Sequence, residues 1–170
     1  GKKNVLVEAY RGERFGTRET SITNSVPQNL TGYWLKKGSD SEVSNVGYNN
    51  AFMTDYPCVL IRLADLYLMK AEAWNEYLAV PDEEHVYAPL NEVRRRAGIP
   101  DVKEAWKTYA KNPGKVATKE GMREIIHREW DIEFAFEGRR FWNLRRWLTA
   151  VDELNEEQYG WNIVGRNARE

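Results

Sequence analysis

The stretch of sequence that decides the fold is IHREWDIEFAFEGRRFWNLRRW, residues 126–147. Its second half, from Glu137 to Trp147, holds four arginines and three large aromatic residues in eleven positions. The first half places apolar residues at helical spacing and carries two glutamates, Glu129 and Glu133, four positions apart. No catalytic motif accompanies the stretch. It is therefore informative about the fold and does not point to a reaction.

The two glutamates of this stretch project onto one helix face. That face lies between Ile125, Ile126 and Phe136, so both carboxylates point along the apolar side of the helix. Because an unpaired buried carboxylate costs several kcal/mol, cationic partners are expected. We predict a structural ion-pair cluster in which Glu129 and Glu133 receive guanidinium groups, which bind carboxylates in two places. The nearby supply is Arg139, Arg140, Arg145 and Arg146, or alternatively Arg94, Arg95 and Arg96.

The functional alternative for Glu129 and Glu133 is the carboxylate pair of a retaining glycoside hydrolase, whose carboxyl groups lie about 5–5.5 Å apart. Such an enzyme keeps one carboxyl protonated by apolar surroundings. Clustered arginines favour the ionised form of both carboxyls. We therefore expect a structural role and no enzymatic activity.

Helix signals predict four helices along the chain, two of them before the opening stretch. Pro57 suits the first turn of a helix, and one apolar stripe then recurs at spacings of three and four until Pro81 stops it. That stripe comprises Leu60, Leu63, Tyr67, Ala71, Trp74 and Leu78. Asp82 can cap a second helix that ends at Gly98, and the short connection favours an antiparallel hairpin. Thr118 caps a third long helix, and Gly138 separates it from a fourth whose stripe is Phe141, Leu144 and Leu148.

Segments outside the helices contain two pairs of aromatic residues. Trp106 and Tyr109 lie in the connection between residues 99 and 117, on what could be a short helix, and Tyr33 and Trp34 lie in the N-terminal region. Both pairs are candidate platforms for stacking sugar rings, and the alternative is packing against neighbouring helices. Residues 1–56 are rich in Gly, Ser, Thr and Asn, and short strands are predicted at 5–10 and 33–37.

The chain is therefore predicted to be all-α, with tetratricopeptide-like antiparallel helix pairs that follow an irregular, loop-rich segment containing short strands. We expect a loop-rich segment at 1–56, a helical core at 57–150 and a polar tail at 151–170. No convincing 34-residue self-similarity supports a regular repeat.

Composition excludes several classes of function. The 170 residues carry a net charge of -1, and residues 118–148 hold seven basic and six acidic side chains, so nucleic-acid binding is not expected. The chain has one cysteine, Cys58, and no His or Cys cluster at metal-ligand spacing, so we expect no metal. Phosphate-loop and dinucleotide fingerprints are absent, and no cofactor is expected.

Three motifs in the same order resemble those of the SusD/RagB family of Bacteroidetes outer-membrane lipoproteins. They are LIRLADLYLMKAEA at 60–73, LNEVRRRAGIP at 90–100 and the opening stretch at 126–147. Asn143 stands where the family usually has Asp, and Asp65 where it usually has Glu. The resemblance covers roughly residues 30–148.

The resemblance implies a nutrient-binding protein that is not an enzyme. Family members bind glycans or other nutrients on the outer face of the outer membrane, act with a SusC-like TonB-dependent transporter and are anchored by a lipidated N-terminal cysteine. The chain resembles only the C-terminal part of such a protein, so the anchor is expected in a part that this chain lacks. The candidate carbohydrate-binding residues are Tyr33, Trp34, Trp106 and Tyr109. A helical-repeat module that binds only protein is the alternative.

Overall fold

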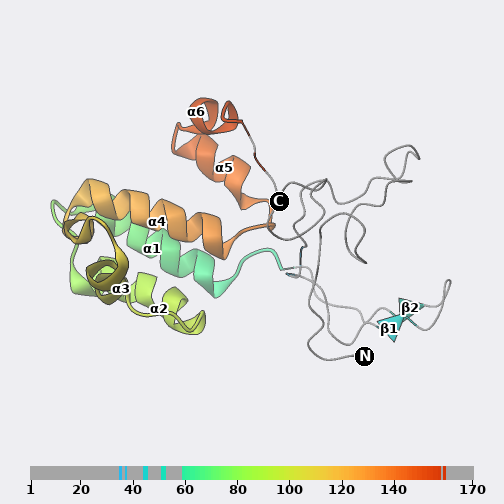
Figure 1. Cartoon of the computed structure of the whole chain (residues 1–170), viewed down its shortest axis with the longest axis horizontal. Coiled ribbons are helices and arrows are strands. Elements are labelled where there is room, and N and C mark those ends of the chain that lie inside the picture. The colour runs from blue at the N-terminus through green and yellow to red at the C-terminus, as the bar shows by residue number, and fades with distance from the viewer. Residues whose placement is uncertain are drawn as a thin grey trace, which may run out of the picture. The chain divides into compact units, whose positions relative to one another are not determined.

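The structure is a computed structural model that describes residues 59–157, Leu35, Lys37, Tyr159 and the strand residues 44–45 and 51–52. Its elements in chain order are β1 (Ser44–Asn45), β2 (Ala51–Phe52), α1 (Leu63–Tyr77), the single-turn π-helix η2 (Glu83–Tyr87), α2 (Ala88–Arg96), α3 (Val102–Tyr109), the 3₁₀-helix η3 (Pro113–Ala117), α4 (Lys119–Glu133), α5 (Arg139–Arg146) and α6 (Ala150–Leu154) (Figure 1). The strands β1 and β2 pair with each other. The chain forms two compact units, residues 52–150 and residues 1–51 with 151–170.

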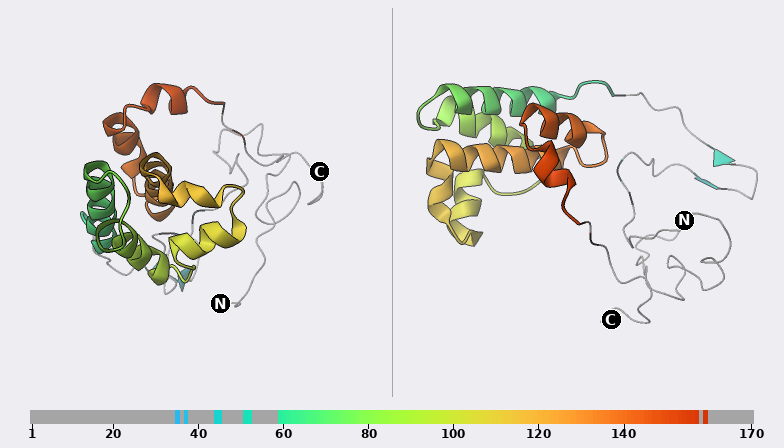
Figure 2. Two further views of the ribbon diagram at one scale, coloured as in Figure 1. Left: turned by 90° about the vertical axis from the view of Figure 1, so that its left-hand side faces the viewer. Right: turned by 90° about the horizontal axis from the view of Figure 1, so that it is seen from above.

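Helix α1 is the central element of the unit 52–150, because it packs against both α2 and α4 (Figures 1 and 2). Asn75, near the end of α1, donates a hydrogen bond to the carbonyl of Lys119 at the start of α4. Arg62, just before α1, pairs with Glu133 at the end of α4. The two helices therefore run antiparallel, and α2 returns antiparallel to α1 through η2.

Local signals set several helix ends as predicted. The Asp82 carboxylate accepts a hydrogen bond from the backbone N–H of His85 at 2.7 Å, which confirms Asp82 as the cap of the second helical segment. The Thr118 hydroxyl accepts from the N–H of Gly121 at 3.1 Å and caps α4 as expected. Gly98 adopts φ 73° after α2, the left-handed conformation that glycine favours at a helix end.

The start of the first helix differs from the prediction. Helix α1 begins at Leu63, and residues 59–62 are not helical, so Leu60 lies outside the helix and is 78% exposed. Asp65 fixes this start, because its carboxylate accepts the backbone N–H of Arg62 at 2.7 Å. Most of the predicted stripe does face the core, because Ala71 is buried and Tyr67, Trp74 and Leu78 are partly buried against it. Leu63 is exposed, and Leu68, which the stripe did not include, is fully buried.

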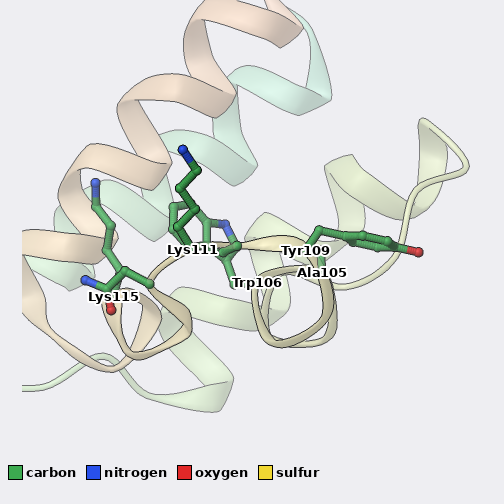
Figure 3. Close-up of a pocket in the computed structure, with 7 residues that line it drawn as sticks. Ala105, Trp106, Tyr109, Lys111 and Lys115 are labelled. Atoms are coloured by element: carbon green, nitrogen blue, oxygen red, sulfur yellow. The ribbon is translucent and has the colours of Figure 1, made fainter.

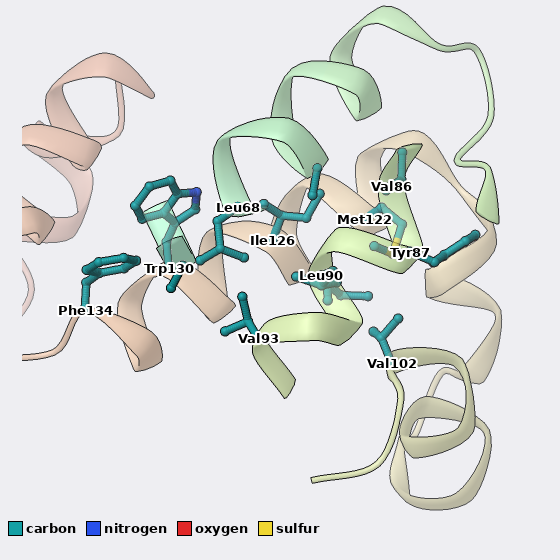
Figure 4. Packing of buried hydrophobic residues seen from close by; sticks show 13 residues of the cluster. Leu68, Val86, Tyr87, Leu90, Val93, Val102, Met122, Ile126, Trp130 and Phe134 are labelled. Atoms are coloured by element: carbon teal, nitrogen blue, oxygen red, sulfur yellow. The ribbon is translucent and has the colours of Figure 1, made fainter. Parts of the chain in front are cut away.

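The hydrophobic core lies between α1, η2, α2 and α4 (Figure 4). Its fully buried members include Leu68 of α1, Leu90 of α2 and Ile126 of α4. Val102, at the start of α3, extends the core toward the α3–η3 segment. Burial of these side chains is the main favourable term that holds the helices together.

The chain between α4 and α5 differs most from the expected helix. Helix α4 ends at Glu133, and Phe136, which the helical projection placed on the apolar side, has φ 64° and is 76% exposed. Gly138 then adopts φ 72°, which confirms it as the break before the next helix. Of the predicted stripe of α5, Leu144 is buried, whereas Phe141 and Leu148 are exposed.

The described part of the chain is thus mostly helical, which confirms the predicted all-α class. The strand predicted at 5–10 lies outside the described residues. Of the strand predicted at 33–37, the two described residues, Leu35 and Lys37, are not in a strand. We propose 57–150 as the limits of the helical core.

Candidate functional site

An open pocket of about 570 Å³ lies on the α3–η3 segment (Figure 3). Both predicted aromatic residues of this segment line it: Trp106 from the middle of α3 and Tyr109 from its last turn. The remaining lining residues are Ala105, Ala110, Lys111, Asn112 and Lys115. The volume falls within the range of small-molecule pockets, and the wall combines aromatic faces with a few polar groups.

The pocket wall is fixed at both ends to the helical core. The buried backbone N–H of Val102 donates to the side-chain oxygen of Asn91 at 2.9 Å, which ties the start of α3 to α2. The Tyr87 hydroxyl donates to the carbonyl of Val116 at 2.7 Å, which ties η3 to η2. A platform held on both sides keeps its geometry when a ligand arrives, which lowers the entropic cost of binding.

The two aromatic residues differ in their surroundings. Trp106 is half-buried and packs against the core, so packing accounts for part of its role. Tyr109 is 79% exposed and extends away from the core (Figure 3). An exposed aromatic face that lines a pocket is available for stacking on a flat apolar surface of a ligand. The other predicted pair, Tyr33 and Trp34, lies outside the described residues.

Two lysines complete the pocket, and the sequence interpretation had not selected them. The Lys115 ammonium lies over the Trp106 ring, 5.7 Å from its centroid, and also pairs with Glu124. Lys111 is exposed beside the same ring (Figure 3). The signal that could have found them is the recurrence of lysine at every fourth position: Lys103, Lys107, Lys111 and Lys115.

The predicted carboxylate pair lies at the seam of α2 and α4. Its partners are Arg94 and Arg96 of α2, from the second of the two predicted arginine groups, and Arg62, which directly precedes α1. Glu129 pairs with Arg94, and their side chains are 10% and 9% exposed. Glu133 pairs with Arg62 at 2.6 Å and with Arg96 at 2.5 Å.

Electrostatics at Glu129 also differ from the expectation. Burial raises the pKa of Glu129, the neighbouring charge of Glu133 adds to the rise, and Arg94 opposes it. Burial therefore outweighs Arg94 in setting the direction of the pKa shift of Glu129, because one guanidinium does not fully replace the lost water.

The arginines between 139 and 146 contact other groups than the two glutamates they were predicted to neutralise. Arg139 lies 3.3 Å from Asp65, and Arg140 pairs with Asp131. Arg145 lies over the rings of Phe141 and Trp142. Arg146 donates two hydrogen bonds to Glu72. The early end of α4 and the left-handed turn at Gly138 reorient α5, which is why these arginines leave the face that the helical projection gave them.

Glu72 connects α5 to α1. Besides Arg146, it accepts a hydrogen bond from the Trp147 indole at 2.9 Å, and His127 stacks on Trp147 with ring centroids 3.6 Å apart. Although burial opposes it, the hydrogen bonds from Arg146 and Trp147 lower the pKa of Glu72. Burial lowers the pKa of His127 against the attraction of Glu72. This cluster fastens the end of α5 to the core.

The described residues contain neither a metal-binding cluster nor a membrane-spanning helix. Within the part of the chain that the structure describes, no three His, Cys, Asp or Glu side chains are grouped to hold a metal ion. Among those same residues, no helix has the length and apolar character required to span a bilayer.

Comparisons with known proteins agree with the motifs. The model described as the SusD family matches residues 5–170. A SusD-like protein of Formosa agariphila is 29% identical over 147 residues, which cover 85% of this chain and 26% of that relative. The chain thus spans about a quarter of the length of the curated relative it matches. No solved structure matches. Because the family match extends over almost the whole sequence, the chain belongs to the SusD family.

Proposed function

We propose that the chain is part of a glycan- or nutrient-binding component of a bacterial outer-membrane uptake system, and that the α3–η3 pocket takes part in binding. The observation that carries this proposal is the shared wall of Trp106 and Tyr109 in an open pocket of about 570 Å³. Sugar rings present apolar C–H faces that stack on such aromatic surfaces, while polar side chains fix their hydroxyls. Membership of the SusD family supports the same function.

The proposed role is binding without catalysis. Glu129 lies under Arg94 and is 10% exposed, and Glu133 is held by Arg62 and Arg96. A hydrolase needs a carboxyl that reaches the glycosidic oxygen and a second that reaches the sugar from the opposite side or activates a water. Neither carboxylate stands in the pocket of Trp106 and Tyr109. Release of reducing sugar from any bound oligosaccharide would contradict this role.

The direct test is a titration of the 170-residue chain with a panel of oligosaccharides, followed by calorimetry and tryptophan fluorescence. Tyr109→Ala should weaken binding about three- to tenfold, because it removes one stacking face. Tyr77→Ala is the matched control, since Tyr77 is also 79% exposed but lies at the end of α1 outside the pocket. Trp106→Phe should abolish the fluorescence response while calorimetric binding persists. Equal affinities for the Tyr109 and Tyr77 variants would refute the assignment of the pocket.

The proposal extends to partner and location. A TonB-dependent transporter of the SusC type is the proposed partner, at the outward face of the outer membrane, and lipid anchoring belongs to the same proposal. It is tested by co-purification of the tagged protein with the transporter and by surface labelling of intact cells. Recovery in the soluble fraction without the transporter would contradict it.

A protein-binding helical module without sugar recognition is the second candidate. Exposed apolar residues before α1 and in its first half favour this candidate; they are Leu60, Ile61, Leu63, Leu66 and Met69. Exposed apolar patches of this kind mark interaction surfaces. Binding to the transporter with no response to any oligosaccharide would favour this candidate over the first.

A further inference from the structure

We infer that the α3–η3 pocket selects acidic saccharides, which carry a carboxylate or a sulfate ester, over neutral ones. This inference rests on the proposed function and names the class of its ligand. It starts from the charge of the segment that builds the pocket. Residues 102–117 contain four lysines and one glutamate, a local net charge of +3, whereas the whole chain has a net charge of -1. The segment that carries the pocket is therefore more positive than the chain as a whole.

The four lysines of this segment are not equivalent. Lys103 pairs with Glu83 at 2.5 Å and contacts the Tyr87 ring, and Lys107 is exposed on α3 without lining the pocket. Lys111 and Lys115 are the two that line it. Within residues 59–157, the structure gives Lys111 no carboxylate partner. An ammonium group placed in this way can receive an external anion without breaking an existing pair.

Lys115 determines how a ligand meets Trp106. Its ammonium lies over the indole, 5.7 Å from the ring centroid, while its other partner is Glu124. A neutral sugar that stacks on Trp106 must displace this cation from the ring and gains no charge partner in return. An acidic sugar can stack on the same ring and retain the ammonium as its counter-ion. The geometry thus favours ligands that combine a stacking face with a negative charge.

The experiment compares ligands that differ only in charge. The full chain is titrated by calorimetry with oligogalacturonate and its methyl-esterified, neutral form, and with sulfated and desulfated forms of one galactan oligosaccharide. The two pairs distinguish a carboxylate preference from a sulfate preference. Lys111→Gln and Lys115→Gln should each reduce the affinity for the acidic form about two- to fivefold more than the affinity for the neutral form, as expected for the loss of an exposed ion pair. The preference should weaken in 0.5 M salt.

Lys107→Gln is the matched control, because it removes the same charge from the same segment outside the pocket. An equal loss in the Lys107 variant would show that the segment attracts anions without a site, and would overturn the inference. Equal affinity for acidic and neutral forms, with both dependent on Tyr109, would also overturn it while the proposed function stood. Binding of neither form would refute the proposed function as well. Polyaspartate bound as tightly as oligogalacturonate would show that charge alone is recognised, which contradicts a saccharide site.

Discussion

The buried pair of Arg94 and Glu129 offers the sharpest test of the fold. Arg94 donates to Glu129 and, through Nε, to the carbonyl of Pro100 at 2.8 Å. Both partners are about nine-tenths buried. Arg94→Met keeps an unbranched, flexible side chain but removes the guanidinium group, and so leaves the carboxylate of Glu129 in the core without this counter-ion. Breaking a buried pair in this way should lower the free energy of unfolding at pH 7 by about 3–5 kcal/mol.

The sign of the pH dependence follows from Glu129. Burial already raises its pKa in the folded protein, and Arg94 opposes the rise. Removing Arg94 raises the pKa of Glu129 in the folded protein further. Between the pKa of Glu129 in the unfolded chain, 4.5, and its higher pKa in the folded variant, ionisation of Glu129 therefore destabilises the variant progressively as the pH rises. The deficit of Arg94→Met should therefore be smaller at pH 5 than at pH 7, which urea unfolding followed by circular dichroism would measure.

Two further variants test whether the loss of stability comes from the unpaired carboxylate of Glu129. Arg94→Met combined with Glu129→Leu should recover most of the stability, because an apolar pair replaces a buried charge pair without leaving a charge unpaired. Arg95→Met is the matched control, since Arg95 is the next residue on α2 and forms an exposed pair with Glu92; its unfolding midpoint should not change. A deficit below about 1 kcal/mol for Arg94→Met, or one that grows on acidification, would refute the account.

Two other outcomes follow from single sites. Gly121→Ala should destabilise the protein by about 1–3 kcal/mol, because a Cβ there would lie 2.0 Å from the Lys115 carbonyl; Gly114→Ala, whose Cβ meets its nearest atom at 3.6 Å, should be tolerated in the same thermal melt. Glu72→Gln should lower the thermal midpoint at pH 7 by weakening the contact with Arg146. The pKa of Glu72 is lowered in the folded protein, so the ionised carboxylate contributes its full stabilisation above the pKa of the unfolded chain, 4.5. This stabilisation is lost as the pH falls through the pKa of the folded protein, so the advantage of the wild type over Glu72→Gln should disappear in acid. An advantage that grows as pH falls below 4.5 would contradict the charge-based explanation.

Local signals in the sequence were sufficient for three helix ends, whereas the start of α1 and the end of α4 differ from the prediction. Thr118, Asp82 and Gly98 act within four residues of themselves, and each has the predicted role. The face that a helix buries was less readable, because α1 carries apolar residues on more than one side. Leu63 and Leu68 both suit a core by type, and only packing against α2 and α4 decides that Leu68 is buried.

The ion pairs show a second limit of sequence reasoning. Arg94 and Glu129 are separated by 35 positions, and Arg62 and Glu133 by 71. Sequence proximity favoured the arginines after Gly138 as partners, but the turn at Phe136 and Gly138 depends on left-handed backbone conformations that no helical projection contains. In the pocket, Trp106 and Tyr109 could be selected because they lie three positions apart on a short helix. The four-residue lysine spacing marks Lys111 and Lys115 but not their approach to Trp106, which depends on the course of η3.

The family motifs and the proposed pocket use different residues, and this separation has a physical consequence. The segments at 60–73, 90–100 and 126–147 supply Asp65, Arg94 and Glu129, whose charges are buried or paired within the core. The pocket is built from 102–117, between two of these motifs, and is joined to the core through Val102 and Val116. Substitutions of its exposed side chains therefore leave the core contacts intact. Lys111→Gln should change ligand preference without changing stability, and Arg94→Met should lower stability without changing ligand preference while the protein remains folded.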